Sequence, residues 1–260
     1  MVKDIRSITA EKMVLVPMLV VPLLMCIAVP GAILALALSL DEVLMTGVQY
    51  IEKLVPLYPV PEGLPGLTDQ VLFIFFNYTF LPLFMLVPIM ASSVIAANSI
   101  VGEKERRTLE TLLYTPVTNR EFLAAKLLAS FVPAVLVSWL AFGGYFLVLN
   151  LLYGLARGML MLRSWIWLPA ILLLSPAVSL LGLSITLVVS LKARSFTEAQ
   201  QTAGVIVLPF IVLIIVQIAG LVTFRPFLVV ALAAVLAAVS YLIIARIAPR
   251  FSREAIISTL

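Results

Sequence analysis

The chain has 260 residues, of which 63% are hydrophobic and only 12% are charged, and its mean hydropathy is +1.19. Soluble domains are about 45–50% apolar and about 25% charged, so this composition excludes an ordinary soluble domain and indicates an integral membrane protein. The chain has no histidine and a single cysteine, which excludes an intrachain disulfide and a metal site built from cysteine or histidine. Its net charge is only +4, and we expect neither a metal ion nor a nucleic acid as a ligand.

The first twelve residues combine an apolar side with a charged side. Val2, Ile5 and Ile8 share one side of a helix, whereas the charged residues lie elsewhere. This pattern predicts a short interfacial helix over residues 1–12, lying in the inner membrane surface ahead of the first span. The alternative is a plain charged flank that only sets the topology.

Six apolar segments follow, each long enough to cross the hydrocarbon core, which takes roughly 20 helical residues. Backbone polar groups find no water in that core, so a crossing segment must be helical. The sequence therefore predicts an all-α integral membrane protein with six transmembrane helices, folded as a single domain over residues 1–260. Prolines recur inside the segments and indicate either kinked helices that line a cavity or ordinary spans. The segments are 13–40, 71–97, 122–152, 165–191, 203–224 and 227–245.

Lysine and arginine orient these spans. Four of the 17 basic residues fall on the side opposite to the N-terminus, namely Lys53, Arg157, Arg163 and Arg225. Because basic residues concentrate on the cytoplasmic side, both termini are predicted to be cytoplasmic.

The segment 41–70 is then the longest predicted outer loop. It carries five acidic residues against one lysine. Its first half is loosely amphipathic, and its second half is interrupted by proline and glycine. A passive loop and a lid over an exit are both compatible with this pattern.

A charged island, GEKERRTLETLLYTPVTNREFLAAK, runs from Gly102 to Lys126 between the second and third spans. Leu109, Leu112 and Leu113 have the spacing of one helical face, and charges of both signs occupy most of the remaining surface. Topology alone requires lysine and arginine but not the glutamates among them. The island is therefore more typical of a surface that docks on another protein than of a solvated loop.

Two signals give this island a defined shape. Pro116 ends its helix, because the residue before a proline is pushed out of the α region. Thr118 and Glu121 match a capping box that opens the third span. A short helix held between two spans can transmit a displacement. Lys126 lies near the inner end of the third span, where its side chain can extend toward water.

The island resembles the cytoplasmic signature of ABC-2 type transporter permeases, the membrane subunits of ATP-binding-cassette exporters. In that family a "TLE-LL" core precedes "(S/T)P", followed by a Glu and a Lys that open the next span. Six spans with the N-terminus inside extend the resemblance to nearly the whole chain. The matching positions are Thr108, Leu109, Glu110, Leu112, Leu113, Thr115, Pro116, Glu121 and Lys126.

The resemblance implies that residues 99–120 form a cytoplasmic coupling segment whose helix docks on a nucleotide-binding subunit. It further implies two ATPase subunits that bind ATP and Mg, and a second permease chain, identical or homologous, in the lipid of a prokaryotic cytoplasmic (plasma) membrane. The residues expected at the ATPase contact are Glu103, Arg106, Arg107, Thr108, Leu109, Glu110, Leu112, Leu113, Pro116 and Glu121.

One feature departs from the family pattern. Related exporters often carry re-entrant helices between the fifth and sixth spans, but here only Phe224 to Phe227 separate them. An outer gate must then come from elsewhere, and the first outer loop is a candidate.

Several absences narrow the function. No GxxxxGK[ST] phosphate loop occurs, so we expect no enzymatic activity and no cofactor in this chain. The centres of the six segments contain no Asp, Glu, Lys, Arg or His, which disfavours a gradient-driven carrier. The serines within the spans have no histidine or intramembrane carboxylate as a base, so no catalytic residue is assigned.

The predicted function is the permease subunit of an ATP-driven exporter. A membrane scaffold that docks a cytoplasmic partner is the main alternative, and a gradient-driven carrier is a weaker one. Gln217, Ser175 and Ser179 are candidate pathway-lining residues, with hydrogen bonding between helices as the alternative role. Gln217 is expected about halfway to two-thirds across the fifth span. The substrate stays open among lipid, drug, peptide and lipid-linked glycan.

Overall fold

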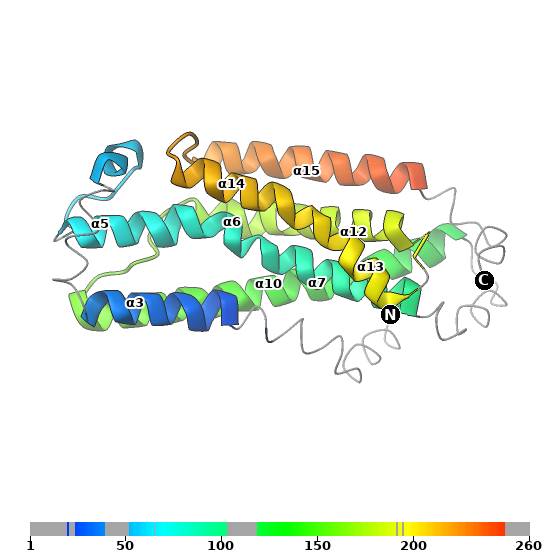
Figure 1. Cartoon of the computed structure of the whole chain (residues 1–260), viewed down its shortest axis with the longest axis horizontal. Coiled ribbons are helices and arrows are strands. Elements are labelled where there is room, and N and C mark those ends of the chain that lie inside the picture. The colour runs from blue at the N-terminus through cyan, green and yellow to red at the C-terminus, as the bar shows by residue number, and fades with distance from the viewer. Residues whose placement is uncertain are drawn as a thin grey trace.

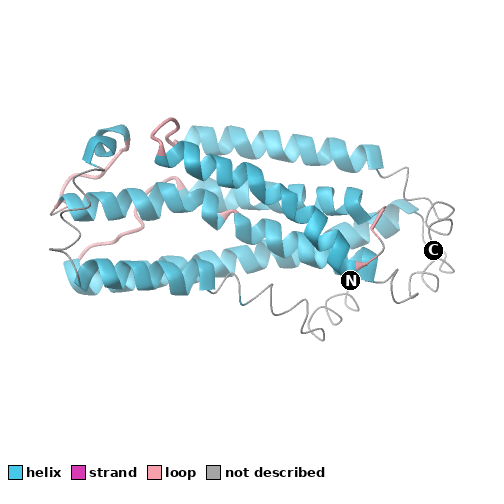
Figure 2. Cartoon of the chain, viewed as in Figure 1, coloured by secondary structure: helices cyan, strands magenta, loops and turns pink. Residues whose placement is uncertain are grey.

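The computed structural model describes residues 20, 24–39, 52–64, 66–102, 119–190, 192–193 and 195–247, and the regular elements in these ranges are all helices (Figure 2). Five of them are long and apolar enough to cross a membrane: Leu67–Ala97, Leu123–Arg157, Trp167–Ser190, Phe196–Ile218 and Pro226–Ile247. The all-helical membrane fold is thus confirmed, with five candidate spans. The first predicted span is described only in part, where Leu24–Ser39 forms a shorter apolar helix.

Several spans are composite, because α-helical pieces alternate with π or 3₁₀ turns. In chain order the elements are η1 (Leu24–Ala28), α3 (Val29–Ser39), η2 (Glu52–Leu57), α5 (Leu67–Ile74), η3 (Phe75–Thr79), α6 (Phe80–Phe84), α7 (Leu86–Ala97), η4 (Asn98–Gly102), α10 (Asn119–Arg157), α11 (Trp167–Pro169), η5 (Ala170–Leu174), α12 (Ser175–Ser190), α13 (Phe196–Ala203), η6 (Gly204–Val207), α14 (Leu208–Ile218) and α15 (Pro226–Ile247).

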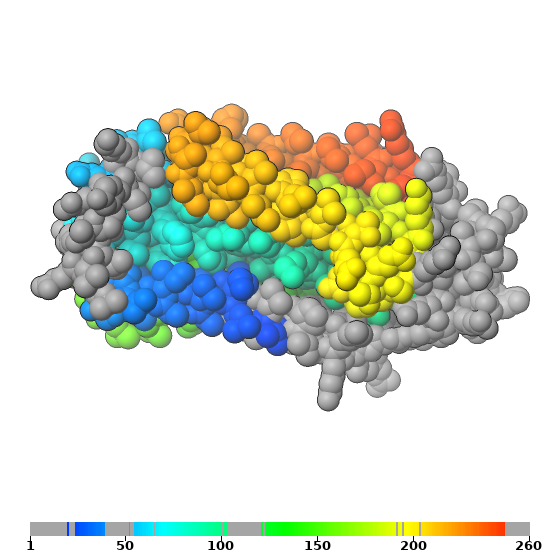
Figure 3. Space-filling view, viewed as in Figure 1, coloured from blue at the N-terminus to red at the C-terminus, as the bar shows by residue number. Residues whose placement is uncertain are grey.

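Consecutive spans run in opposite directions along an elongated bundle (Figure 1). The helix Leu67–Ala97 is central, with 83% of its most apolar stretch buried, and its α7 portion packs against α10 and α12. The last two spans are peripheral, with 18% and 17% buried, and α13 and α14 run across one face of the molecule (Figure 3). The end that holds η2 and the loop 158–166 is called the outer end below, after the predicted orientation.

Prolines explain the breaks in the central spans. Pro30, Pro82 and Pro176 each follow a π turn by two or three residues, and Pro88 follows the break between α6 and α7. A proline cannot donate to the carbonyl four residues earlier, so the preceding turn widens. The predicted kinks are therefore found as π turns, whereas Pro133 lies inside an unbroken α10.

Helix ends differ from the predicted bounds where capping residues decide them. The fifth span covers Phe196–Ile218 instead of 203–224. At its start the Ser195 hydroxyl accepts a hydrogen bond from the Glu198 backbone N–H at 3.2 Å and so caps the helix. At its end Gly220 adopts a φ of 72°, which stops the helix.

The second span also begins earlier than predicted. Its helix starts at Leu67, so the last four residues of the predicted loop 41–70 are helical. Gly66 has an extended backbone at this start, and Asp69 lies in the first turn, where a carboxylate is stabilised by the helix dipole.

A glycine sets the spacing of the two most buried helices. A Cβ atom on Gly182 of α12 would lie 2.5 Å from the Ser92 Oγ atom and 3.2 Å from the Ile89 carbonyl oxygen of α7. Only glycine therefore allows this approach, which is typical of helix contacts in membranes.

Candidate functional site

Most of the predicted coupling segment 99–120 lies outside the described residues. The described parts are its flanks, where η4 ends at Gly102 and α10 begins at Asn119, and Glu121 is exposed in the first turn of α10. The interfacial helix 1–12 and both termini also lie outside the described residues, as do the other residues expected at the ATPase contact: Glu103, Arg106, Arg107, Thr108, Leu109, Glu110, Leu112, Leu113 and Pro116.

The flank that leads into the coupling segment packs against the fifth span. Ala97 and Val101 form one buried cluster with Ala193 and Ala199. The first two residues belong to α7 and η4, and Ala199 belongs to α13. We call these four residues the inner joint. Because the side chains of the inner joint are small, η4 and α13 approach closely. A displacement of one element would therefore shift the other.

Lys126 is buried at the inner end of α10, with 6% of its surface exposed. Its predicted extension toward water is therefore not found. The neighbouring Leu123 packs in a buried cluster with Leu187 and Ile247, which brings the inner ends of three spans together.

Ser175 and Ser179 lie in α12 and are both fully buried. The hydroxyls of Ser175 and of Ser138 in α10 are 2.8 Å apart and share a hydrogen bond. The Ser179 hydroxyl has no hydrogen-bond partner among the described residues. Ser175 thus links two helices, and neither serine faces an open path in this conformation.

Gln217 is the penultimate residue of α14, so it lies at the outer end of the fifth span and not near its middle as predicted. The difference follows from the helix bounds, because the helix ends before Gly220. Its side chain is fully buried, and both amide atoms lack a hydrogen-bond partner within the described part of the chain. Its backbone carbonyl accepts a hydrogen bond from the Tyr58 hydroxyl at 3.2 Å.

Tyr58 follows η2 directly and is buried, although it belongs to the outer loop. Burial raises the pKa of its hydroxyl, so the group stays protonated and able to donate near neutral pH. Its ring lies against the ring of Tyr78 with centroids 5.2 Å apart. The Tyr78 hydroxyl accepts from the Ser164 hydroxyl at 3.2 Å. We call Tyr58, Tyr78, Ser164 and Gln217 the outer closure, since they join two spans and two loops.

The loop 158–166 is fixed by two asparagines of the spans. The Asn77 side-chain amide donates to the Met161 carbonyl at 2.9 Å, and the Leu162 backbone N–H donates to Asn150 Oδ1 at 2.9 Å. Both asparagines therefore hold the loop 158–166 in place and do not line a path through the membrane.

A buried acidic residue lies beside this loop. Asp69 is 3% exposed, and its Oδ1 atom accepts a hydrogen bond from the Tyr153 hydroxyl at 2.9 Å. The Arg157 Nε atom lies 3.5 Å from the same oxygen. This cluster was not predicted from the sequence. The sequence gives one indication of it: Asp69 directly precedes an apolar segment, and Arg157 is predicted to lie on the same, outer side of the membrane.

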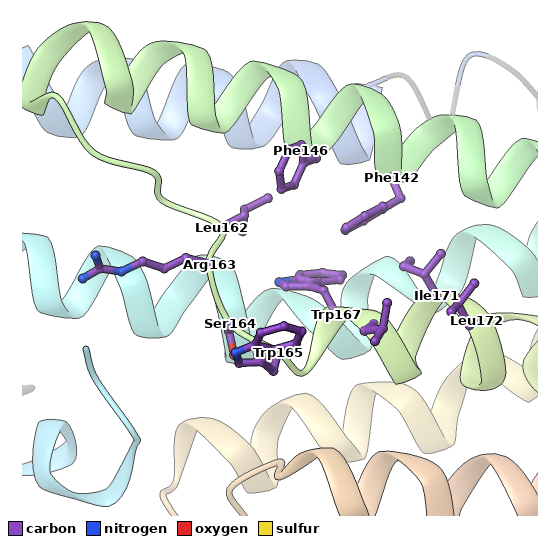
Figure 4. Close-up of a pocket in the computed structure, with 10 residues that line it drawn as sticks. Phe142, Phe146, Leu162, Arg163, Ser164, Trp165, Trp167, Ile171 and Leu172 are labelled. Atoms are coloured by element: carbon purple, nitrogen blue, oxygen red, sulfur yellow. The ribbon is translucent and has the colours of Figure 1, made fainter. Parts of the chain in front are cut away.

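An aromatic groove opens between α10 and the start of the fourth span and is called the outer groove. Its volume is about 350 Å³. Phe142 and Phe146 of α10 point into it from one side and Ile171 and Leu172 from η5, while Arg163 extends away from the aromatic rings (Figure 4). Ser164 adds one hydroxyl, and the rest of the lining is apolar and includes Trp165, Trp167 and Leu168.

A comparison with protein families gives one match. The family model described as ABC-2 family transporter protein matches residues 1–248. No curated protein and no solved structure matches the chain. The match covers the described spans, the outer closure and the predicted coupling segment alike.

Proposed function

Because this chain belongs to the ABC-2 family of transporter proteins, we propose that it is the transmembrane permease subunit of an ATP-driven exporter. The family match over residues 1–248 is the observation that carries this proposal. Members of the family generally pair with ATPase subunits, and the sequence contains no phosphate loop. ATP and Mg would then be bound by a separate subunit, and this chain would have no catalytic residue.

The proposed assembly contains two ATPase subunits and a second permease chain, identical or homologous. Six spans provide half of a pathway in this family, so a second copy or a sister chain completes it. The assembly would lie in the plasma membrane of a prokaryote, with residues 99–120 and both termini on the cytoplasmic side. The low number of basic residues on the outer side supports this orientation.

In the proposed mechanism, ATP binding draws the ATPase subunits together and displaces the coupling segment. Its flank η4 touches α13 through the inner joint, so the fifth span would move with it. The other end of that span carries Gln217, whose carbonyl is bonded to Tyr58. The fifth span thus connects the inner joint, beside the coupling segment, with the outer closure. The outer closure must open for a substrate to leave.

The outer closure takes the place of the re-entrant gate of related exporters in this proposal. The loop between α14 and α15 is short, with Gly220 at its start and Pro226 opening α15. The first outer loop instead reaches the top of the fifth span through Tyr58. This contact favours the lid over the passive loop for residues 52–64.

The substrate class follows from the character of the spans. Their centres carry no Asp, Glu, Lys, Arg or His, so a path between two such chains would suit a lipid, a drug, a peptide or a lipid-linked glycan. A free ion would require charged or carbonyl rings that the sequence does not provide.

Co-purification tests the proposal directly. The tagged chain is isolated from membranes of its own cell in mild detergent, and mass spectrometry identifies bound proteins that contain a phosphate loop. The matched variants are Glu110→Arg, in the predicted contact, and Glu62→Arg, an exposed glutamate of the outer loop. We expect an ATPase with the native chain and with Glu62→Arg, and none with Glu110→Arg.

The alternatives predict other outcomes. Recovery of a cytoplasmic partner that has no phosphate loop would favour the membrane scaffold. Transport by the reconstituted chain alone, driven by a proton or sodium gradient, would favour the carrier. Recovery of the ATPase with all three chains would remove Glu110 from the contact but leave the exporter function in place.

A further inference from the structure

We propose that the outer groove binds a membrane phospholipid with an anionic headgroup, its acyl chain along the aromatic wall and its headgroup at Arg163. The site is independent of the transport function proposed above. It concerns a lipid of the surrounding bilayer and not the transported substrate.

The walls of the groove suit an acyl chain. Phe142 and Phe146 form one side, and Trp167 packs against Phe142 with ring centroids 5.2 Å apart, so that the wall is continuous. The volume of about 350 Å³ falls at the lower end of the range for ligand pockets, about 300–1,000 Å³.

The groove opens sideways, where lipid is the solvent. Trp165 is 79% exposed, and Leu168 and Leu172 are more than half exposed on the same side. Leu168 of α11 and Leu172 of η5 belong to a membrane span, where exposed apolar side chains face hydrocarbon, and Trp165 lies in the turn just before this span. A water-soluble ligand would have to cross lipid to enter, whereas a phospholipid is already there.

The position of the groove matches the headgroup level at its outer edge. It lies where the loop 158–166 passes into α11, at the outer start of the fourth span, and two of the three tryptophans of the chain line it. Tryptophan concentrates at this level, because its ring is apolar and its N–H is polar. A lipid lying there would have its glycerol near Trp165 and its chain toward Leu172.

Arg163 supplies the charge selectivity. Its side chain is exposed and points away from the aromatic rings (Figure 4), toward the outer end of α10. Within the described part of the chain, no carboxylate lies within ion-pair distance of it, and the nearby Asp69 already has Arg157 at 3.5 Å. The Arg163 guanidinium is therefore available to a phosphate group at the mouth of an apolar groove, an arrangement that prefers an anionic amphiphile.

Quenching of tryptophan fluorescence tests the site. The full chain is reconstituted in phosphatidylcholine bilayers that contain either brominated phosphatidylglycerol or brominated phosphatidylcholine at the same mole fraction. Bromine on the acyl chain quenches nearby indoles, and Trp165 and Trp167 both line the groove. We expect the anionic lipid to quench more strongly, with an apparent association roughly fivefold higher, the effect of one basic residue at a membrane surface.

Two arginine variants test whether the preference for the anionic lipid arises at Arg163. Arg163→Gln should abolish it, whereas Arg225→Gln, an exposed arginine of another outer loop that does not line the groove, should retain it. Filling the groove with Leu168→Phe and Leu172→Phe together should weaken quenching by both lipids. Equal quenching by the two lipids in the native chain would overturn the proposal. So would a preference that survives Arg163→Gln, or one that disappears equally in Arg225→Gln.

Discussion

The Tyr58 hydroxyl donates a hydrogen bond to the backbone carbonyl of Gln217 at 3.2 Å, although 159 positions separate the two residues. The same carbonyl accepts the Gly220 backbone N–H at 2.9 Å, where the helix ends. One acceptor thus joins the first outer loop to the turn that stops the fifth span. Opening the outer end of the molecule requires that this contact be broken.

Loss of the Tyr58 side chain should expose the buried end of the fifth span. Tyr58→Ala removes a hydrogen bond and a ring contact, together about 1–3 kcal/mol. The opened state should therefore become roughly tenfold more populated or more. A cysteine at Gln217→Cys, in a Cys26→Ala background, reports this as faster labelling by a membrane-impermeant thiol reagent.

The control for this experiment is Tyr241→Ala, which removes an exposed tyrosine of α15. It should leave the labelling rate unchanged. If Tyr58→Ala labels as slowly as the parent chain, the loop does not close the outer end.

The buried Asp69 should make Tyr153 important for stability. Tyr153→Phe removes the donor to Oδ1 and leaves a buried carboxylate with one hydrogen bond fewer, at a cost of about 1–3 kcal/mol. Arg157→Gln should cost less, because that side chain is 30% exposed and the ion pair is partly screened. Thermal unfolding in detergent measures both effects.

The exposed Tyr241 again provides the control, since Tyr241→Phe deletes a hydroxyl that faces outward. Its unfolding midpoint should match that of the native chain. A midpoint for Tyr153→Phe that also equals the native value would show that the Asp69 hydrogen bond contributes nothing to stability.

The sequence allowed the helices to be predicted because the bilayer leaves no alternative for a long apolar segment. Five predicted segments are helices of spanning length, and the prolines at 30, 82 and 176 mark real π turns. The bounds were less accurate. The fifth span ends six residues before the predicted end, because Gly220 stops it while apolar residues continue. Hydropathy cannot detect that stop.

The polar contacts of the site could not be predicted in the same way. Whether Asp69 meets Tyr153, or Tyr58 meets Gln217, depends on which spans are neighbours and on their rotation about their axes. A single sequence with nearly uniform apolar faces carries little of that information. For Ser175 the sequence offered two roles, and the contact with Ser138 shows hydrogen bonding between helices.

Replacement by leucine should lower the stability of the protein at Gly182, in the contact between α7 and α12, but not at Gly143. Gly182→Leu places a side chain where a Cβ atom alone would lie 2.5 Å from Ser92 Oγ, so the helices must separate, at a cost of about 1–3 kcal/mol or more. Gly143→Leu adds the same side chain at an exposed position with no atom within 4 Å of its Cβ. The first variant should unfold at a lower temperature, and the second should retain or exceed the native midpoint. Equal loss in both would mean that Gly143 is covered by another chain.

Substitutions in the predicted coupling helix should uncouple the ATPase from transport, an expectation that rests on the proposed exporter function. Leu112→Asp places a charge in the predicted leucine face of the coupling helix, and Glu110→Arg reverses a charge beside it. Both variants should insert into the membrane normally, because neither residue lies in a span. In vesicles that contain the ATPase partner, they should uncouple ATP hydrolysis from transport. Glu62→Arg, on the outer side, should behave as the native protein.

An overpacked inner joint should reproduce this defect without touching the ATPase contact. Ala199 is fully buried against η4, and Ala199→Leu would push α13 away from it. The complex should then still assemble, so co-purification of the ATPase is retained while transport per ATP falls. If Ala199→Leu transports normally and Leu112→Asp does not, the displacement reaches the membrane through α10 and the third span instead of through α13. If both transport normally, residues 99–120 are not the coupling segment.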